Sequence, residues 1–281
     1  MIDLNYQDLN INMDKNNPVN LKNRNSVFLL LIIVSLIFSI SLMLVYADNT
    51  SVITSSQKIL CEGSQFETTA YFFLSEQNGP IVMIMAGVHG DEFAGIEATK
   101  QFIKRINDTG LKKGTVIIIP EANKEAVNNS VRAMSPLEDL NRNFPGEPAS
   151  EGIKGLAGEI FDIIIKNEVD FLLDLHESVD YFQEGATFYG QTIVLDDHDI
   201  LLKEVADYLL QELNSAIIYP ENQFQIIQKP IEGSSTYESL DKTGTPGITF
   251  ETCTKIEYGR RVEFHLICIE KLLDYFDMIL P

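Results

Sequence analysis

The sequence predicts an α/β fold in which a mostly parallel, mixed central sheet carries helices on both faces. Short runs of consecutive apolar residues alternate along the chain with segments in which apolar residues recur every three or four positions. The apolar runs do not alternate with polar residues, which is typical of strands that are buried on both faces. The 281-residue chain also suits one sizeable domain after a short leader. We therefore expect one domain of this class, with ligands bound at the carboxyl ends of its strands.

Five segments have the composition of strands in such a sheet. The clearest two, 80–86 and 114–120, are continuous apolar runs that begin or end at glycine or proline. The other predicted strands are 170–175, 188–195 and 246–251. The predicted helices, which have the amphipathic spacing needed to cover a sheet, are 93–106, 151–167, 200–213 and 263–280.

An uncharged apolar segment precedes this domain. Residues 27–45 read VFLLLIIVSLIFSISLMLV. At about 1.5 Å per residue, a helix over these residues would be roughly long enough to cross a hydrocarbon core of about 30 Å. Because Lys15, Lys22 and Arg24 precede the segment, the positive-inside rule places the amino terminus in the cytoplasm. We expect a single-pass membrane protein whose main domain is extracytoplasmic. Cleavage of a signal peptide near Ala47 is the alternative, and it would give a secreted protein.

These observations divide the chain into four parts. We expect a polar cytoplasmic tail over 1–26, a transmembrane signal anchor over 27–46, a tether over 47–58 and a single domain over 59–281. The anchor would make the membrane one partner of the protein.

Charge and cysteine content exclude some other classes of partner and site. The formal net charge of −20 argues against nucleic acid as a partner, because phosphate binding needs clustered lysine and arginine. The three cysteines form no CxxC pair of the kind that binds zinc. Outside the cytoplasm one disulfide could form, and the sequence leaves its pairing open among Cys61, Cys253 and Cys268.

The motif GVHGDE follows the predicted strand 80–86 directly. Its His89 and Glu92 are separated by two residues at a strand-to-helix turn, so both side chains can reach one metal ion. Gly87 and Gly90 allow the backbone to turn tightly there. The spacing alone is a weak signal, but its position at a strand end strengthens it.

A second histidine follows another predicted strand. His176 comes directly after 170–175, so it would lie at the same edge of the sheet as His89. Two histidines and one glutamate form the three-ligand set of a catalytic zinc ion, which keeps a fourth position for water. The remaining histidines, His198 in an acidic run and His265 on a predicted helix, are better explained as solvated or packed residues.

Other polar residues are predicted to lie at the same edge. Glu251 ends the predicted strand 246–251, where it could act as a general base. In the motif DLNRNFPG, Arg142 lies between two asparagines in a loop that ends with Pro-Gly, which suggests a clamp for an anion. Arg132 lies upstream in the chain and could join this clamp.

Four motifs in this order resemble the zinc carboxypeptidase superfamily: GVHGDE, DLNRNFPG, DLHES and TFE. The resemblance is closest to its succinylglutamate desuccinylase and aspartoacylase branch, and it covers roughly residues 81–251. It implies a carboxypeptidase-like α/β fold that binds one zinc ion per chain. It also implies that His89, Glu92 and His176 are the metal ligands.

The resemblance implies roles for the other motif residues as well. Glu251 would be the general base, and Asp139 would hold the first ligand histidine from behind. Arg132 would polarise the scissile carbonyl, while Asn141 and Arg142 would bind the substrate carboxylate. We leave open whether Tyr237 is a substrate-binding tyrosine or a packed helix residue.

The activity that the resemblance implies is zinc-dependent hydrolysis of an amide bond in an N-acyl amino acid or related small amide. Only thirty residues follow Glu251, whereas aspartoacylase-like enzymes usually carry a β-rich domain there. Because single-domain exported relatives that trim peptides lack this domain, the alternative is an exported metallocarboxypeptidase that acts on peptides or cell-envelope peptides. A binding module without catalysis is a third hypothesis, weakened by the presence of every expected ligand and the base.

Overall fold

The structure is a computed structural model that describes residues 28, 31–37 and 53–280, apart from 186, 197, 198, 216 and 230. The chain divides into two units, Met1–Asn49 and Thr50–Pro281. In the first unit, residues 31–37 are helical. No helix among the described residues is long and apolar enough to cross a membrane. The expected anchor, 27–46, lies mostly outside the described residues, so it stays a prediction.

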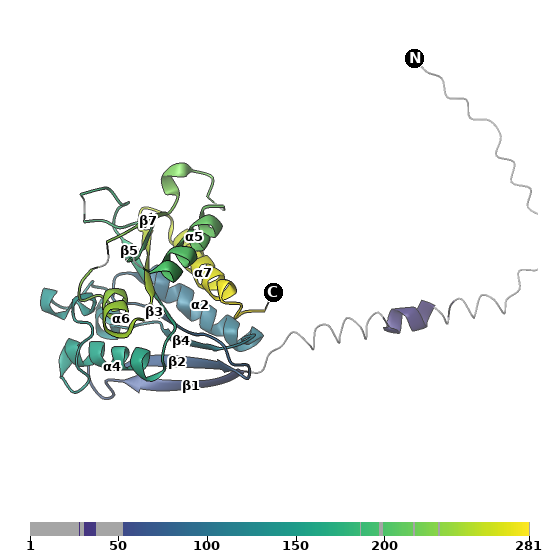
Figure 1. Ribbon diagram of the computed structural model, residues 1–281, viewed down its shortest axis with the longest axis horizontal. Helices are drawn as coiled ribbons and strands as arrows, with labels where there is room; N and C mark the ends of the chain where they lie inside the picture. The colour runs from purple at the N-terminus through teal and green to yellow at the C-terminus, as the bar shows by residue number, and fades with distance from the viewer. Residues whose placement is uncertain are drawn as a thin grey trace, which may run out of the picture. The chain divides into compact units, whose positions relative to one another are not determined.

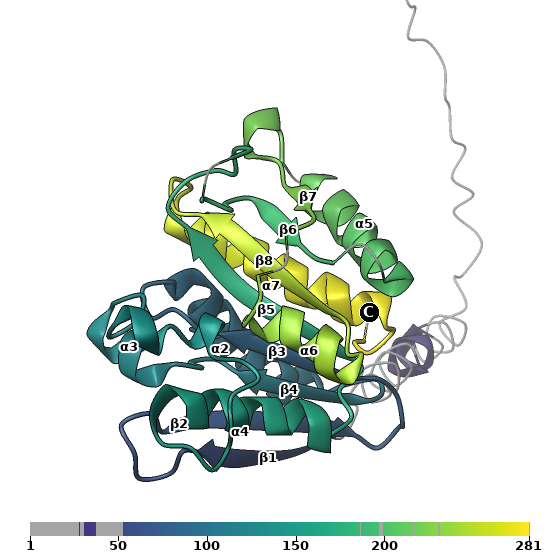
Figure 2. The same ribbon diagram turned by 60° about the vertical axis from the view of Figure 1, so that its left-hand side comes forward.

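The second unit contains an eight-stranded mixed sheet with the order β1-β2-β4-β3-β5-β8-β6-β7 (Figures 1 and 2). The strands are Ile53–Leu60 (β1), Thr68–Ser75 (β2), Ile81–Ala86 (β3), Thr115–Ile119 (β4), Phe171–Ser178 (β5), Thr192–Val194 (β6), Gln225–Ile227 (β7) and Gly247–Cys253 (β8). Parallel pairing joins β4, β3, β5 and β8 at the centre. The pairs β1–β2, β2–β4 and β6–β8 are antiparallel. The predicted α/β class with a mixed central sheet is confirmed.

Three strands and one boundary differ from the sequence-based expectation. The strands β1, β2 and β7 were not predicted; β1 is mostly exposed and polar, so it lacks the apolar run of a central strand. Residues 53–58, assigned to the tether, belong to β1, so the expected boundary at residue 59 is wrong. The predicted strand 188–195 corresponds to the shorter strand β6, which begins only at Thr192. The chain turns just before it, at Gln191, where φ is 62°.

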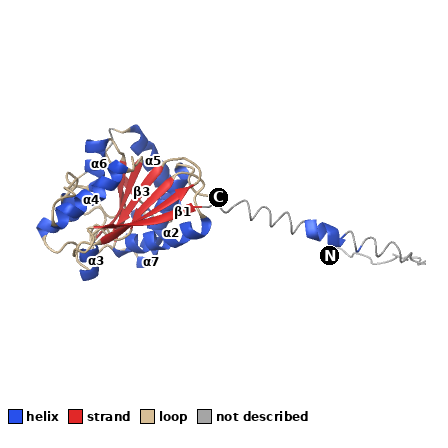
Figure 3. Ribbon diagram, turned by 90° about the horizontal axis from the view of Figure 1, so that it is seen from below, coloured by secondary structure: helices blue, strands red, loops and turns tan. Residues whose placement is uncertain are grey.

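Six helices cover the sheet and its edges. They are Phe93–Thr109 (α2), Lys124–Asn129 (α3), Gly152–Lys166 (α4), Ile200–Ser215 (α5), Ser235–Thr243 (α6) and Tyr258–Tyr275 (α7). The four helices expected from the sequence correspond to α2, α4, α5 and α7. Figure 3 shows that helices lie on both sides of the strands, as the buried strand pattern predicted.

Alternation along the strands separates the core into two layers. In β3, Val82 and Ile84 pack in the layer that contains α2, α5 and α7, whereas Met83 and Met85 pack in the layer that contains α4. Successive strand side chains point to opposite faces, so this alternation determines which polar residues share a face. Near the carboxyl ends of β5 and β8, this alternation directs the side chains of His176 and Glu251 to the face that carries α4 and α6.

Candidate metal centre

His176 and Glu251 are neighbours across the sheet. Their Cα atoms are partners in the parallel ladder between β5 and β8, and partners in neighbouring strands point to the same face. Asp174, two residues before His176, accepts a hydrogen bond from Ser235 at the start of α6, which identifies that face. The sequence placed both site residues at strand ends, but β5 continues to Ser178 and β8 to Cys253.

The loop that carries His89 is held against the backbone of α3. Gly87 has a φ of 67°, a left-handed conformation that glycine adopts without strain. A Cβ atom on Gly90 would lie 2.0 Å from the carbonyl carbon of Ala126, so only glycine permits this close approach. Gly87 also accepts a hydrogen bond from the N–H of Asn123. These contacts hold the loop in the conformation that directs His89 toward the sheet.

Three buried donor groups converge at this point. Nδ1 of His89 lies 2.7 Å from Oε1 of Glu92, and Nδ1 of His176 lies 2.9 Å from Oε2 of the same carboxylate. The two Nδ1 atoms are 3.1 Å apart. Ligands at about 2.0–2.1 Å from a tetrahedral zinc ion lie roughly 3.3 Å apart, so a small expansion of this group would accommodate an ion. The residues that the sequence predicted as ligands are therefore together in the fold.

The outward-facing nitrogen of each histidine meets a second carboxylate. Nε2 of His89 lies 3.2 Å from Oδ1 of Asp139, as the resemblance implied. Nε2 of His176 lies 3.2 Å from Oδ2 of Asp174, although the two atoms are not aligned as a hydrogen bond. Carboxylates in these positions orient a metal-binding imidazole and make it more basic. Sequence reasoning missed Asp174, which the two-residue period of the strand could have identified.

The charges around the donor group favour a bound cation. Burial alone would lower the pKa of His176, but the carboxylates of Asp174 and Glu92 outweigh it and raise that pKa well above its usual value. Burial would raise the pKa of Glu92, yet the two histidines hold it well below its usual range. Three buried or nearly buried carboxylates, those of Glu92, Asp139 and Asp174, thus surround two imidazoles. The donor set and its charge both fit a divalent metal ion.

Glu177 connects the metal-binding elements behind the donor group. Its N–H donates to Oε2 of Glu92 at 3.0 Å, and its own Oε2 accepts the N–H of Ala94 at the start of α2, at 2.9 Å. Arg261 of α7 forms an ion pair with the same carboxylate. Sequence reasoning missed this contact, because no local pattern relates residues that far apart in the chain. The contact links β5, α2 and α7 beside His176.

The arginine predicted to polarise the carbonyl and the two residues predicted to bind the substrate lie at different depths. Arg132 donates to Oδ2 of Asp139 at 3.1 Å and comes within 3.8 Å of Glu92, with half of its side chain exposed. Asn141 is buried and accepts the N–H of Ser235 at 3.4 Å. Arg142 is exposed, and its guanidinium donates to the carbonyl of Asn141 at 2.6 Å. Arg132 is therefore at the donor group, whereas Arg142 is exposed beside Asn141.

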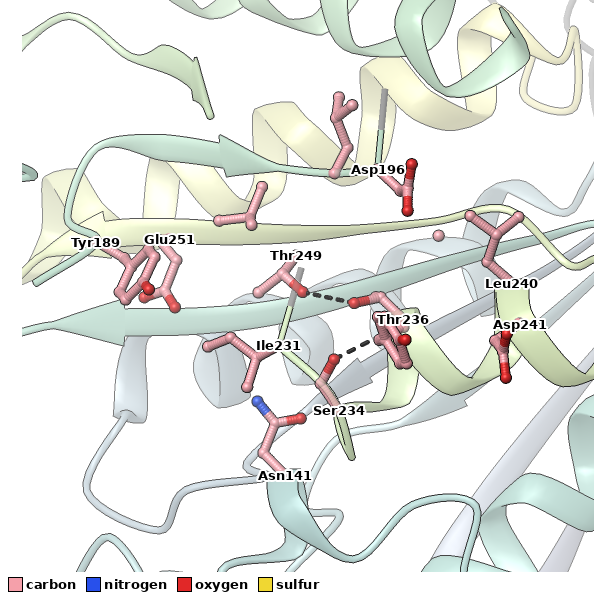
Figure 4. A pocket seen from close by; sticks show the side chains of 14 residues that line it. Asn141, Tyr189, Asp196, Ile231, Ser234, Thr236, Leu240, Asp241, Thr249 and Glu251 are labelled. Carbon is pink, nitrogen blue, oxygen red and sulfur yellow. Dashed lines mark hydrogen bonds between the residues drawn. The ribbon is translucent and has the colours of Figure 1, made fainter. Parts of the chain in front are cut away.

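Glu251 lies in the wall of a cavity of about 190 Å³, which Asn141 and Tyr237 also line (Figure 4). Burial raises the pKa of the Glu251 carboxyl to about 7, although His176 opposes that rise. A carboxyl group with a raised pKa is a suitable group for exchanging protons near neutral pH. Tyr237, which the sequence left open, is a half-buried residue of α6 in this wall.

The remaining histidine and cysteine predictions have separate outcomes. His265 is buried and contacts Thr252, and burial lowers its pKa to about 3, as expected of a packed residue outside the metal group. His198 lies outside the described residues. All three cysteines are free thiols, so the structure contains no disulfide between them.

Comparison with known proteins identifies the family. The sequence model of the succinylglutamate desuccinylase/aspartoacylase catalytic domain matches residues 78–254. The chain belongs to this family. The matched segment contains every residue of the donor group together with Glu251, and the resemblance expected from the four motifs is confirmed.

A curated protein shares sequence with part of the chain. It is the N-alpha-acetyl-L-2,4-diaminobutyric acid deacetylase of Halomonas elongata, which is 35% identical over 100 residues. The aligned region is 35% of this chain and 28% of the deacetylase. The chain therefore matches less than a third of that relative.

Two solved structures share the fold. The Helicobacter pylori D,L-carboxypeptidase Csd4, in its mDAP-bound form, has a TM-score of 0.62 and 21% identity, covering 70% of this chain and 51% of Csd4. The product-bound ectoine utilization protein EutE (DoeB) from Ruegeria pomeroyi has a TM-score of 0.61 and 16% identity, covering 83% of this chain and 72% of that protein. At these identities the similarity shows the fold alone.

Proposed function

We propose that this chain is a zinc-dependent hydrolase that cleaves the amide bond of an N-acyl amino acid or a related small amide. The observation that carries the proposal is the convergence of His89, Glu92 and His176 beside Glu251, next to a cavity of the size of one side chain. Family membership supports amide hydrolysis, and the deacetylase relative acts on an N-acetyl amino acid according to its name.

The metal would be held by His89, Glu92 and His176, with Asp139 and Asp174 behind the two imidazoles. Zinc bound there would supply Lewis acidity toward the scissile carbonyl and lower the pKa of the attacking water. The carboxylates behind the histidines would help to hold both Nδ1 atoms toward a bound ion, since each imidazole has its other nitrogen 3.2 Å from a carboxylate oxygen.

The protein residues would perform the proton transfers and hold the substrate. The Glu251 carboxylate would take a proton from the attacking water and return it to the leaving nitrogen. The Arg132 guanidinium, next to Glu92 and Asp139, would stabilise the oxyanion that develops on the carbonyl oxygen. Asn141 would bind the carboxylate of the substrate inside the cavity, and Arg142 would contact it from the exposed side.

A metallocarboxypeptidase is the second candidate. The same residues would accept the last residue of a peptide, because a peptide and an N-acyl amino acid present the same carboxylate and scissile amide. The fold shared with Csd4 is compatible with this function. The two candidates differ in what lies beyond the scissile carbonyl, which is a short acyl group in one and a longer peptide in the other.

A substrate panel tests both candidates. The zinc-loaded full chain, purified in detergent, is incubated with N-acetyl and N-succinyl amino acids and with peptides of two to five residues, and released amino acids are quantified. We expect turnover of acyl amino acids with a kcat/KM at least about tenfold above that of the peptides. Release of carboxy-terminal residues from peptides without turnover of acyl amino acids would establish the second candidate instead.

We also propose that the chain is anchored in a membrane with its hydrolase domain extracytoplasmic, or secreted if the leader is cleaved near Ala47. The support is the uncharged sequence 27–46 with basic residues before it. Membranes prepared from cells that express the full chain should retain it through an alkaline carbonate wash and release it in detergent. Release by carbonate would contradict the anchor, and a soluble extracellular form that begins near Ala47 would support cleavage.

A further inference from the structure

Glu92 is the N-cap residue of α2, but its side chain does not cap that helix. An N-cap side chain usually accepts a hydrogen bond from an N–H of the first turn, because those N–H groups have no partner inside the helix. The Glu92 carboxylate makes no such bond. Its two oxygens lie instead at 2.7 Å from Nδ1 of His89 and at 2.9 Å from Nδ1 of His176. The first turn of α2 therefore needs an acceptor from another part of the chain.

Glu177 of β5 supplies this acceptor. Its Oε2 accepts the N–H of Ala94, the second residue of α2, at 2.9 Å. Ala94 is fully buried, so this N–H depends on a protein acceptor rather than on bulk water. The first turn of α2 contains no acidic residue of its own, and a carboxylate near a helix N-terminus is stabilised by the helix dipole. Glu177 thus performs the capping that Glu92 does not.

The main chain of Glu177 also holds the Glu92 carboxylate directly. Its N–H donates to Oε2 of Glu92 at 3.0 Å. Side chains alternate along β5, so His176 points to the face that carries α4 and α6, whereas Glu177 points to the face that carries α2 and α7. One residue therefore holds both the metal-binding carboxylate, through its main chain, and the start of the helix that follows it, through its side chain.

The Glu177 carboxylate is in turn held by α7, which packs beside α2 (Figure 1). Arg261 of α7 forms an ion pair with Oε1 of Glu177, and Thr252 of β8 donates to the same oxygen at 3.3 Å. The side chain of Glu177 is 1% exposed and that of Arg261 is 13% exposed, so solvent screens this pair little. Nε of Arg261 also donates to the carbonyl of Ile256 at 3.0 Å. Both oxygens of Glu177 are therefore used, and its side chain is fixed.

We propose that Glu177 is a positioning residue for the metal site, which caps α2 in place of Glu92 so that the Glu92 carboxylate can serve as a ligand. Arg261 is the second positioning residue, because it holds Glu177. Without this cap, the first turn of α2 would lack a partner, and Glu92, one residue before it, would lose its fixed position. The proposal rests on the metal binding in the proposed function. It makes zinc affinity depend on α7, a helix outside the donor group.

Zinc affinity is the first measurement. Glu177→Met keeps the length of the side chain but removes both of its oxygens. The zinc dissociation constant is measured on the full chain in detergent, by competition with a chelator of known affinity. We expect it to rise by about 10- to 100-fold, the range found when a group that supports a metal ligand is removed. The variant should also be less stable, because Arg261 is left without its buried partner.

A double variant separates positioning from stability. Glu177→Met combined with Arg261→Met replaces the buried ion pair by apolar side chains, a change that often costs no stability. We expect the Tm of the metal-free protein to return toward that of the wild type while zinc affinity stays lowered. Glu270→Met is the matched control, since Glu270 of α7 pairs with Arg105 of α2, about three and a half turns along α2 from Glu92. It should leave zinc affinity unchanged.

Amide hydrogen exchange provides a readout that does not depend on zinc. In the metal-free double variant, the amides of residues 93–95 should exchange at least about tenfold faster than in the wild type, because the first turn of α2 has lost its acceptor. Unchanged exchange there, zinc affinity that recovers together with stability, or an equal loss of affinity in Glu270→Met would overturn the proposal. If the wild-type chain binds no zinc, the proposed function is wrong, and the exchange rates still decide whether Glu177 caps α2.

Discussion

The Glu251→Gln variant is expected to lose turnover by a factor of about 10² to 10⁴, the usual contribution of a general base. Glutamine has nearly the same shape as glutamate but cannot take a proton from the attacking water. Glu251 lies next to His176 in the sheet, and its pKa is raised to about 7 because the carboxyl is buried. The substitution therefore removes the proton acceptor while the neighbouring donor group stays in place.

Two measurements keep this prediction specific. Zinc content should stay near one ion per chain, because Glu251 is outside the donor group, and only kcat should fall. Glu76→Gln is a suitable control, since Glu76 is an exposed glutamate just after β2 and belongs to no part of the site. Unchanged turnover in Glu251→Gln would show that another group is the base.

The His176→Ala variant is expected to lose both metal and activity. The change removes one of three ligands, leaves the buried carboxylate of Asp174 without its imidazole partner, and leaves Glu92 with only one of its two. Metal analysis should find about one zinc ion per wild-type chain and less than about a tenth of that in the variant. Chelation of the wild-type protein should abolish activity, and added zinc should restore it.

Two further variants distinguish a metal ligand from the carboxylate behind it and from a buried histidine outside the donor group. Asp174→Asn keeps the imidazole and should weaken zinc binding by about 10- to 100-fold without abolishing it. His265→Asn alters a buried histidine outside the donor group, so the folded variant should keep its zinc. Equimolar zinc in folded His176→Ala protein would contradict the assignment of His176 as a ligand.

Much of the fold could be predicted because central strands and amphipathic helices carry strong local signals. The apolar run of β3 and the periodicity of α4 identified their elements directly. The edge strand β1 could not be recognised, since its mostly polar and exposed residues look like those of a loop. Its position depends on pairing with β2, which local sequence does not encode.

The candidate site also combines residues that local spacing relates with residues that only strand register or helix packing brings together. His89 and Glu92 could be related by their spacing, because both lie on one short turn. His176 and Glu251 were each expected near a strand end, but their shared position in the ladder depends on the register of β5 against β8. The contact between Glu177 and Arg261 depends on the packing of α7 and had no sequence signal.

By itself, the sequence determined the α/β class, the family motifs and the residue types that can bind a metal and exchange protons. These properties depend on local periodicity and on spacing within a few residues. Only the tertiary structure decided that Asp174 lies behind His176, and that α6 and the end of β6 line a cavity next to Glu251. Such features depend on strand register and helix packing between distant segments, and they come from burial of the whole core rather than from any one segment.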